Sequence, residues 1–209
     1  MRPFTRHTGR MAPLDRANVD TDQIAPKQFC KRIERSGYGP FAFYNWRREE
    51  PDFVLDRPEH LGASVLVAGD NFGCGSSREH AVWALEDAGY RVVIAPSFGD
   101  IFRTNCHKTG LLPIALPEAD VARLTALAAA APAAVAEVDL EAQTVTAGGH
   151  RFRFDIEPFV KECLLHGWDD IGLTLRYEAE IARFELGRAG WMDPEEDRAL
   201  ARPRSRSGN

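Results

Sequence analysis

The chain has 209 residues, of which 44% are hydrophobic, and it carries a formal net charge of −5 at pH 7. This length and apolar content are sufficient for one domain with a buried core. The negative net charge offers no basic field that would follow a phosphate backbone, so we expect no nucleic-acid partner. The apolar stretches are short or interrupted by charges, so we expect no membrane partner either.

The cysteines and the first residues predict a cytoplasmic chain that binds no metal of its own. The four cysteines, at positions 30, 74, 106 and 163, form no C-x-x-C pair and have no histidines at zinc-site spacing. Packed, reduced thiols are therefore the expected state. The first sixteen residues contain four arginines but lack the apolar segment of a signal peptide, so we expect the protein in the cytoplasm.

Two segments near the N-terminus have no clear helical or strand period. Residues 18–29, NVDTDQIAPKQF, are rich in turn-forming side chains and predict a structured loop. Residues 31–58 mix aromatic and charged side chains. This second segment is either a long excursion over a surface or a small aromatic core of its own.

From residue 64 onward the sequence predicts alternating strands and helices. The β-branched runs 64–69 and 91–96 flank a helical segment with Ala81, Ala84 and Leu85 on one face. This pattern indicates a βαβ unit with two parallel strands. It is followed by a helix over 98–110, a strand over 111–116 and a helix over 117–131.

The last third changes character and predicts antiparallel strands followed by helices. Alternating segments predict strands over 134–140, 143–147 and 150–156, and AGGH predicts a hairpin between the last two. Helices are expected over 157–167 and 169–189, the second with one broad apolar face made by Ile171, Leu175, Ile181 and Phe184. We expect one domain over 1–191, with 31–58 as an inserted loop and a disordered tail over 192–209.

The stretch GDNFGCGSSREHA, residues 69–81, joins the first predicted strand of the βαβ unit to its helix. A glycine-rich turn at a helix N-terminus presents backbone N–H groups and the positive end of the helix dipole. Gly73 and Gly75 permit close approach, Ser76 and Ser77 supply hydroxyls, and Arg78 can bind a carboxylate through two nitrogens. The predicted ligand is a carboxylate or a phosphate.

Two other interpretations of this stretch remain open on the residues alone. Ser76 and Glu79 fit the S-x-x-E capping box, in which the serine only caps the helix. Cys74 lies near a helix N-terminus and an arginine, which favour a reactive thiolate. No histidine and acid partner is identifiable for Cys74, so a small packed residue is the preferred interpretation of this position.

Three motifs occur in a specific order: DTDQI (20–24), GSSREHA (75–81) and SFGDIFRTNCHKTGLLP (97–113). With these motifs the chain resembles the small subunits of 3-isopropylmalate dehydratase, which are swivel-domain members of the aconitase superfamily, from about residue 4 to 191. The resemblance implies an α/β swivel domain of three β/β/α layers. The implied domain combines a parallel sheet containing the βαβ unit with antiparallel strands and C-terminal helices.

The resemblance also implies an activity and a partner. The expected enzyme is a hydro-lyase of leucine biosynthesis that interconverts 2-isopropylmalate and 3-isopropylmalate, which are small hydroxy-dicarboxylates. A separate large subunit would carry a [4Fe–4S] cluster whose iron binds the substrate hydroxyl, in a heterodimer or a heterotetramer. No cofactor is expected on this chain.

The resemblance assigns roles to six positions. Ser76 corresponds to the base that takes the proton from the carbon next to a carboxylate. Ser77 and Arg78 are expected to hold a substrate carboxylate. The remaining substrate-binding positions are Thr21, Asp22 and Gly75, of which Asp22 resembles an active-site acid.

Departures from the family pattern leave the substrate open. Ala25, Cys30, His107 and Thr109 stand where other residues are usual, and they leave the serine loop untouched. One alternative is the small subunit of a hydro-lyase for citraconate and 2-methylmalate, or of the homoaconitate type. An alternative from a different class is a non-catalytic module that binds carboxylates without a partner.

Overall fold

The computed structural model describes residues 1–131 and 133–188. The chain divides into two compact units, Met1–Asp169 and Asp170–Asn209. The predicted disordered tail, 192–209, lies outside the described residues. The expectation of a single domain over 1–191 therefore stays a prediction.

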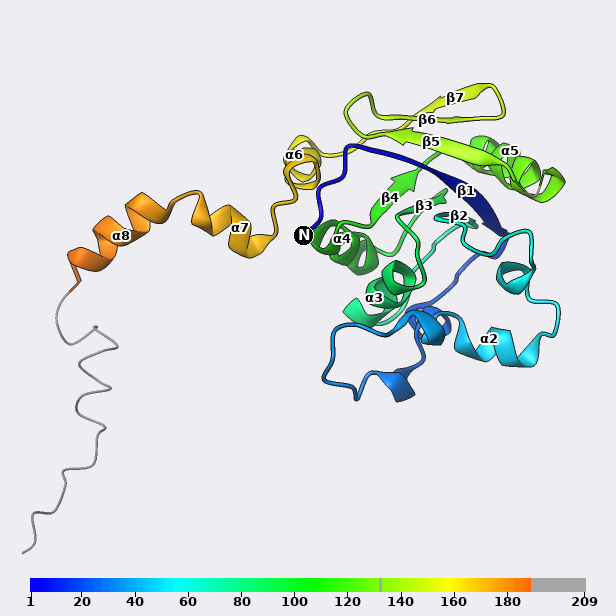
Figure 1. Cartoon of the computed structure of the whole chain (residues 1–209), viewed down its shortest axis with the longest axis horizontal. Helices are drawn as coiled ribbons and strands as arrows, with labels where there is room; N and C mark the ends of the chain where they lie inside the picture. Colours follow the sequence, from blue (N-terminus) through cyan, green and yellow to red (C-terminus); the bar gives the residue numbers. More distant parts are fainter. Residues whose placement is uncertain (132, 189–209) are drawn as a thin grey trace, which may run out of the picture. The chain divides into compact units, whose positions relative to one another are not determined.

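A seven-stranded mixed sheet forms the centre of the first unit, in the order β4-β3-β2-β1-β5-β6-β7 (Figure 1). Strands β1 to β4 pair in parallel, and β1, β5, β6 and β7 pair antiparallel. The strands are β1 (Arg6–Leu14), β2 (Val65–Ala68), β3 (Val92–Ala95), β4 (Leu112–Ala115), β5 (Val135–Asp139), β6 (Thr144–Ala147) and β7 (His150–Arg153). The predicted combination of a parallel βαβ sheet with antiparallel strands is confirmed.

Strand β1 joins the two halves of the sheet and was not predicted from the sequence. Its first half pairs with β5, with Arg6 opposite Asp139, and its second half pairs with β2, with Met11 opposite Val65. Only its last four residues are fully buried. Because the first half of β1 is polar, the sequence pattern did not indicate this strand, which lies in the middle of the sheet.

The helices of the first unit follow the predicted alternation. They are α1 (Thr21–Ile24), α2 (Tyr44–Glu49), α3 (Glu79–Asp87), α4 (Asp100–Thr109), α5 (Glu118–Ala130) and α6 (Pro158–His166). The predicted loop 18–29 contains the one-turn helix α1 and a 3-10 turn over Lys27–Phe29. In the part of the chain that the structure describes, no helix is long and apolar enough to cross a membrane.

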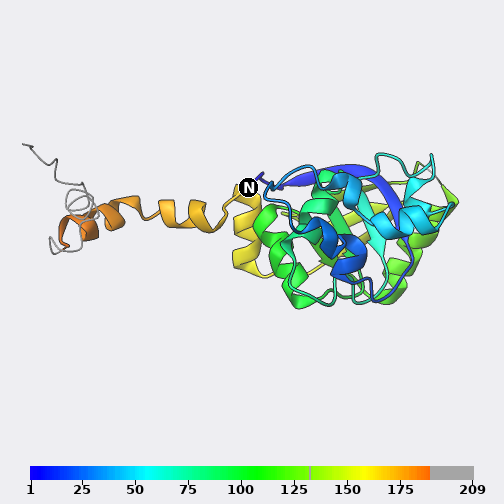
Figure 2. The same cartoon turned by 90° about the horizontal axis from the view of Figure 1, so that it is seen from below.

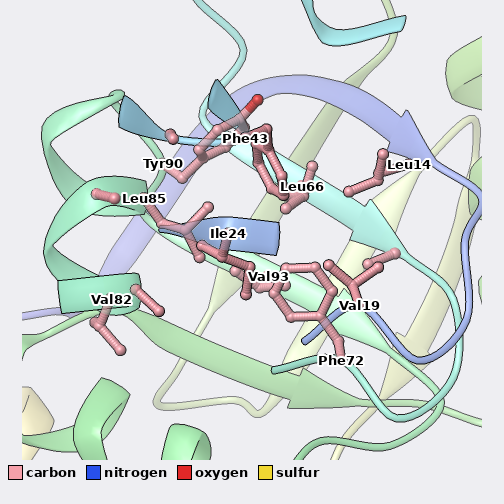
Figure 3. Close-up of a cluster of buried hydrophobic side chains, with 14 of the residues drawn as sticks. Leu14, Val19, Ile24, Phe43, Leu66, Phe72, Val82, Leu85, Tyr90 and Val93 are labelled. Atoms are coloured by element: carbon pink, nitrogen blue, oxygen red, sulfur yellow. The ribbon is translucent and has the colours of Figure 1, made fainter. Parts of the chain in front are cut away.

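Alternating residues of the parallel strands divide the core into two clusters. In β2, Leu66 and Ala68 belong to the cluster under α1, α3 and α4, whereas Val65 and Val67 face α5 and the antiparallel strands. Figure 3 shows the first cluster, in which Ile24, Leu85 and Val93 converge from three elements. Helices α1, α3 and α4 thus cover one face of the parallel strands, and α5 and the antiparallel strands cover the other, in agreement with the expected layers.

The aromatic segment 31–58 contributes to the first cluster. Tyr38, Phe43 and Phe53 are buried in it, and the backbone N–H of Tyr38 donates to Asp87 Oδ2 at 2.7 Å. The segment contains α2 and two 3-10 turns, Gly39–Phe41 and Val54–Asp56. It is therefore neither a loose excursion nor a separate core, because its aromatic rings complete the main core beside α3.

Over its described residues, which end at position 188, the second unit contains two helices, α7 (Asp170–Leu175) and α8 (Glu178–Leu186) (Figure 2). The prediction of one continuous helix over 169–189 is wrong, because the helix is interrupted between α7 and α8. There, Arg176 N donates to Leu173 O at 3.3 Å and Tyr177 N donates to Thr174 O at 3.0 Å. Bonds to the third preceding residue tighten the backbone into a turn and interrupt the α-helix.

His107, near the end of α4, makes the stability of the fold depend on pH. Burial, with the nearby charge of Arg103 adding to it, lowers the pKa of His107 to about 4. Between pH 6.5 and pH 4 the unfolded chain therefore binds more protons at this position than the folded chain, so unfolding becomes easier as the pH falls. From pH 7.5 to pH 5 this one group is expected to remove about 2 kcal/mol from the free energy of unfolding.

Denaturant titrations of the wild-type chain and of His107→Phe at both pH values measure this effect. On acidification from pH 7.5 to pH 5, we expect the free energy of unfolding of the phenylalanine variant to fall by about 2 kcal/mol less than that of the wild type. Equal losses in the two proteins would contradict the proposed origin of the pH dependence.

Candidate active site

Three segments meet at the carboxyl ends of parallel strands β1, β2 and β3. Bridges join Asp20 to Cys74 and Phe72 to Phe98, and Gly73 N donates to Val19 O at 2.7 Å. The loop after β2 thus lies between the loops that follow its two neighbouring strands. The carboxyl edge of a parallel sheet is where α/β folds place their ligands.

Gly73 allows this loop to turn tightly against α4. Its φ is +72°, and an added Cβ would lie 2.2 Å from the Phe102 ring. The following segment is equally close, because a Cβ on Gly99 would lie 2.5 Å from the carbonyl oxygen of Gly73. The contacts of Phe98 and Gly99 with the glycine-serine loop were not predicted, although both residues lie in the motif SFGDIFRTNCHKTGLLP.

Thr21 fastens α1 to the glycine-serine loop. Its side chain is buried, with 1% of the residue exposed. The backbone N–H of Thr21 donates to Cys74 O at 3.0 Å, and its hydroxyl donates to Ser76 O at 2.9 Å. The backbone and side chain of this one residue therefore hold the loop at Cys74 and at Ser76.

Ser76 and Ser77 are exposed and precede α3. Helix α3 begins at Glu79 with Arg78 as its N-cap, and the Arg78 side chain makes no capping hydrogen bond. The capping-box interpretation of Ser76 and Glu79 is therefore wrong. The two serines follow Gly75, whose φ is +86°, and lie before the N-terminus of α3.

The capping box lies instead at the start of α1. Gln23 N donates to Asp20 Oδ1 and Asp20 N donates to Gln23 Oε1, each at 2.8 Å. Asp20 and Gln23 are the first and fourth residues of the DTDQI motif, and this D-x-x-Q pattern serves the same purpose as S-x-x-E. This cap orients the first turn of α1, which carries Thr21 and Asp22.

An ion pair connects the two predicted site segments, since Arg78 Nη1 pairs with Asp22 Oδ1. The hydrogen bond from Arg78 lowers the pKa of Asp22, and the bond from Lys27 N at 3.1 Å adds to this effect. The same pairing raises the pKa of Arg78. Asp22 is more exposed than Arg78, with 47% against 17% of the side chain accessible, so the pair opens toward solvent on the Asp22 side.

The cysteines near the site do not have the properties of a nucleophile. Burial, with Asp20 adding to it, raises the pKa of the Cys74 thiol, and burial also raises that of Cys30. A raised pKa favours the unreactive thiol form. Among the described residues, no group of three histidine, cysteine or acidic side chains is placed to hold a metal ion.

Sequence profiles of known families define the class of this fold and site. The profile described as "Aconitase C-terminal domain" matches residues 1–119, which include every predicted site residue. The profile described as "LeuD_N" matches 122–158, and the profile of the C-terminal domain of 3-isopropylmalate dehydratase small subunits matches 170–193. The chain therefore has the swivel-type domain of the aconitase superfamily.

Curated relatives define the family more narrowly. The 3-isopropylmalate dehydratase small subunit of Rubrobacter xylanophilus is 54% identical over 192 residues, covering 92% of this chain and 98% of that protein. The protein of the same name from Geobacillus kaustophilus is 56% identical over 191 residues, covering 88% and 96%. The chain belongs to the family of 3-isopropylmalate dehydratase small subunits.

A solved structure supports the same fold. The crystal structure of 3-isopropylmalate dehydratase (leuD) from Methanocaldococcus jannaschii superposes with a TM-score of 0.64. The match covers 85% of this chain and 98% of that chain, at 24% sequence identity. At this identity the likeness concerns the fold alone, and it agrees with the α/β swivel domain that the resemblance implies.

Proposed function

We propose that this chain is the small subunit of a hydro-lyase of leucine biosynthesis that interconverts 2-isopropylmalate and 3-isopropylmalate. The observation that carries the proposal is the exposed Ser76 on a loop held by Thr21, with the Arg78–Asp22 pair beside it. The full-length relatives bearing that enzyme's name support the substrate class. The reaction removes water to give an alkene and adds water back at the neighbouring carbon.

Ser76 is the proposed base. The proton to be removed lies on the carbon next to a carboxylate and is weakly acidic, so a serine must act as its alkoxide. The positive N-terminus of α3 and the nearby Arg78 guanidinium favour a negative oxygen at this position. Ser76 is not needed as a helix cap, so its hydroxyl can face the substrate.

Arg78 and Ser77 are proposed to bind a substrate carboxylate. Arg78 is already held by Asp22 through one nitrogen, which leaves its other nitrogens for a ligand. Asp22 is proposed to orient this guanidinium, and its low pKa keeps it ionised at neutral pH. Gly75 leaves space for the substrate because it has no side chain.

Thr21 is proposed as a positioning residue that acts through Ser76, because its hydroxyl is buried and already donates to the Ser76 carbonyl. Thr21→Val should lower the free energy of unfolding by about 1 kcal/mol. It should also lower kcat about 10-fold, since small displacements of a reacting group are costly. KM should change little.

Thr21→Ser retains the hydroxyl and serves as the control for this prediction. Denaturant titration and steady-state kinetics of the reconstituted enzyme measure both variants. A valine variant with a normal kcat, or a serine variant as impaired as the valine variant, would contradict the positioning role.

The large subunit is the proposed source of the [4Fe–4S] cluster. The small-subunit designation of the relatives implies a larger partner chain. The cysteines of this chain do not fit a cluster, because Cys106 and Cys163 are buried and the described residues bring no three ligands together. We propose a heterodimer or heterotetramer in the cytoplasm.

Reconstitution tests the proposed function. The chain is co-expressed with the large subunit of the same genome, purified without oxygen and assayed by the ultraviolet absorbance of the alkene formed from 3-isopropylmalate. Alkene formation that requires both chains is the expected result. A stable complex without alkene would overturn the substrate assignment, and citraconate and homoaconitate would then be assayed.

A further inference from the structure

Ser97 lies just after strand β3 at the carboxyl edge of the sheet, and its hydroxyl contacts the start of the glycine-serine loop. Ser97 Oγ donates to Asp70 Oδ1 at 2.5 Å and accepts a hydrogen bond from the backbone N–H of Asn71 at 2.9 Å. Asp70 and Asn71 lie two and three residues after the end of β2. One hydroxyl therefore fixes two consecutive residues where the loop leaves the sheet.

The two bonds of Ser97 hold the chain at a turning point. Asn71 has a φ of +55°, a left-handed conformation that asparagine adopts more readily than most residues. The bond to Asp70 has a length typical of a hydroxyl bonded to a charged oxygen, and such bonds are about twice as strong as those between neutral groups. Ser97 thus fixes the backbone at the residue where the loop changes direction.

A second set of bonds extends this arrangement to the loop after β1. Asn71 Nδ2 donates to Asn18 Oδ1 at 2.8 Å, and the backbone N–H of Asn18 donates to Asp70 O at 2.8 Å. We call Asn18, Asp70, Asn71 and Ser97 the edge network. None of these four residues belongs to either core cluster. The edge network therefore joins three loops at the site without taking part in the apolar core.

The chain between the edge network and Ser76 is tightly packed. Phe72 N donates to Ser97 O at 3.0 Å, and Phe72 and Gly73 are buried. A Cβ on Gly73 would lie 2.2 Å from the Phe102 ring, so no free space separates the loop from α4 at this point. Closely packed groups transmit a displacement instead of absorbing it. A shift at Asn71 is therefore expected to reach Ser76.

We propose that Ser97 is a positioning residue, which sets the place of Ser76 by fixing the first residues of the glycine-serine loop. This inference rests on the proposed function, which supplies the reaction. Thr21 holds the same loop at its other end, at Cys74 and Ser76. The Ser97 hydroxyl donates its hydrogen to Asp70, so it acts through the loop and not on the substrate.

Kinetics of the reconstituted enzyme test this role. Ser97→Ala removes both hydroxyl bonds and is expected to lower kcat about 10-fold while KM stays within twofold of the wild type. Ser97→Thr keeps the hydroxyl, and because Ser97 is exposed the added methyl group has room, so its kcat should stay within twofold. Thr104→Val is the control, because it removes an exposed hydroxyl that donates to Asp100 O within α4, and it should also stay within twofold.

The Ser76→Ala background separates positioning from a general structural role. There, the addition of Ser97→Ala should change kcat less than twofold, because the group whose place Ser97 sets has been removed. A role in folding or in assembly with the large subunit would lower kcat by the same factor in both backgrounds.

Amide hydrogen exchange of the full chain without its partner provides a readout that does not depend on activity. Ser97→Ala should speed exchange of the Asn71 N–H at least 10-fold and of the Thr21 N–H, which bonds Cys74 O, at least threefold. The N–H of Val93, in the middle of the buried strand β3, should exchange as in the wild type. Ser97→Thr should match the wild type at all three positions.

The outcomes distinguish this inference from the proposed function. A normal kcat in Ser97→Ala, an equally impaired Ser97→Thr, or equal losses in the two backgrounds would overturn the positioning role. If the wild-type pair forms no alkene, the proposed function fails and exchange decides alone. Unchanged exchange at Thr21 in Ser97→Ala would then overturn the inference, whereas faster exchange would support Ser97 as the residue that holds the loop.

Discussion

Ser76→Ala is expected to lower kcat of the reconstituted enzyme by about 10³-fold or more, because it removes the proposed base from a reaction that begins with a weakly acidic C–H bond. The KM should remain close to that of the wild type, since Arg78 and Ser77 still hold the carboxylate. Ser76 is exposed and caps no helix, so the free energy of unfolding should not change. Steady-state kinetics and denaturant titration measure the two quantities separately.

Ser36→Ala is a matched control for this prediction. Ser36 is also an exposed serine outside any helix or strand, and its loss should leave kcat within twofold of the wild type. A Ser76→Ala enzyme with near-normal turnover would refute the assignment of the base. Loss of turnover accompanied by loss of the complex would instead indicate a structural role.

Arg78→Lys is expected to raise KM about 10- to 100-fold. An ammonium cannot reproduce the planar fork that binds Asp22 and a carboxylate at the same time. A smaller fall in kcat should accompany the change, because the positive charge near Ser76 is retained but displaced. Initial rates over a wide range of 3-isopropylmalate concentrations measure both parameters.

The control for Arg78 is Arg151→Lys on strand β7, where the arginine is exposed in the antiparallel half of the sheet. This variant should have an unchanged KM. An Arg78→Lys enzyme with unchanged KM would remove Arg78 from the proposed carboxylate site. Asp22→Asn separates the two functions of the arginine, because it leaves the guanidinium in place without its ionic partner.

Local sequence patterns predicted most elements of the first unit. Short apolar runs bounded by turn residues located β2, β3 and β4, and helical spacing located α3, α4 and α5. These patterns are reliable because each strand is buried on both faces and each helix buries one stripe. Strand β1 was missed because its polar first half is stabilised by pairing with β5, more than 120 residues later in the chain.

In the candidate site too, local motifs were predicted and contacts between distant segments were missed. The serine, arginine and aspartate were identified from short motifs, but the S-x-x-E pattern at Ser76 wrongly competed as a helix cap. That cap was wrong because α3 begins only at Glu79, and the capping box that Asp20 and Gln23 form on α1 was not predicted. The burial of Thr21 and its bond to Ser76 O, 55 residues away, had no local signal.

The sequence by itself determined the alternation of strands and helices, the glycine-serine loop and the types of residue that the proposed chemistry requires, because these depend on neighbours within a few turns of chain. Only the tertiary structure decided that β1 joins the two halves of the sheet, that Arg78 pairs with Asp22 and that Thr21 holds the loop. These contacts join residues far apart in the chain. Their geometry is established only when the core packs and fixes the ends of the parallel strands side by side.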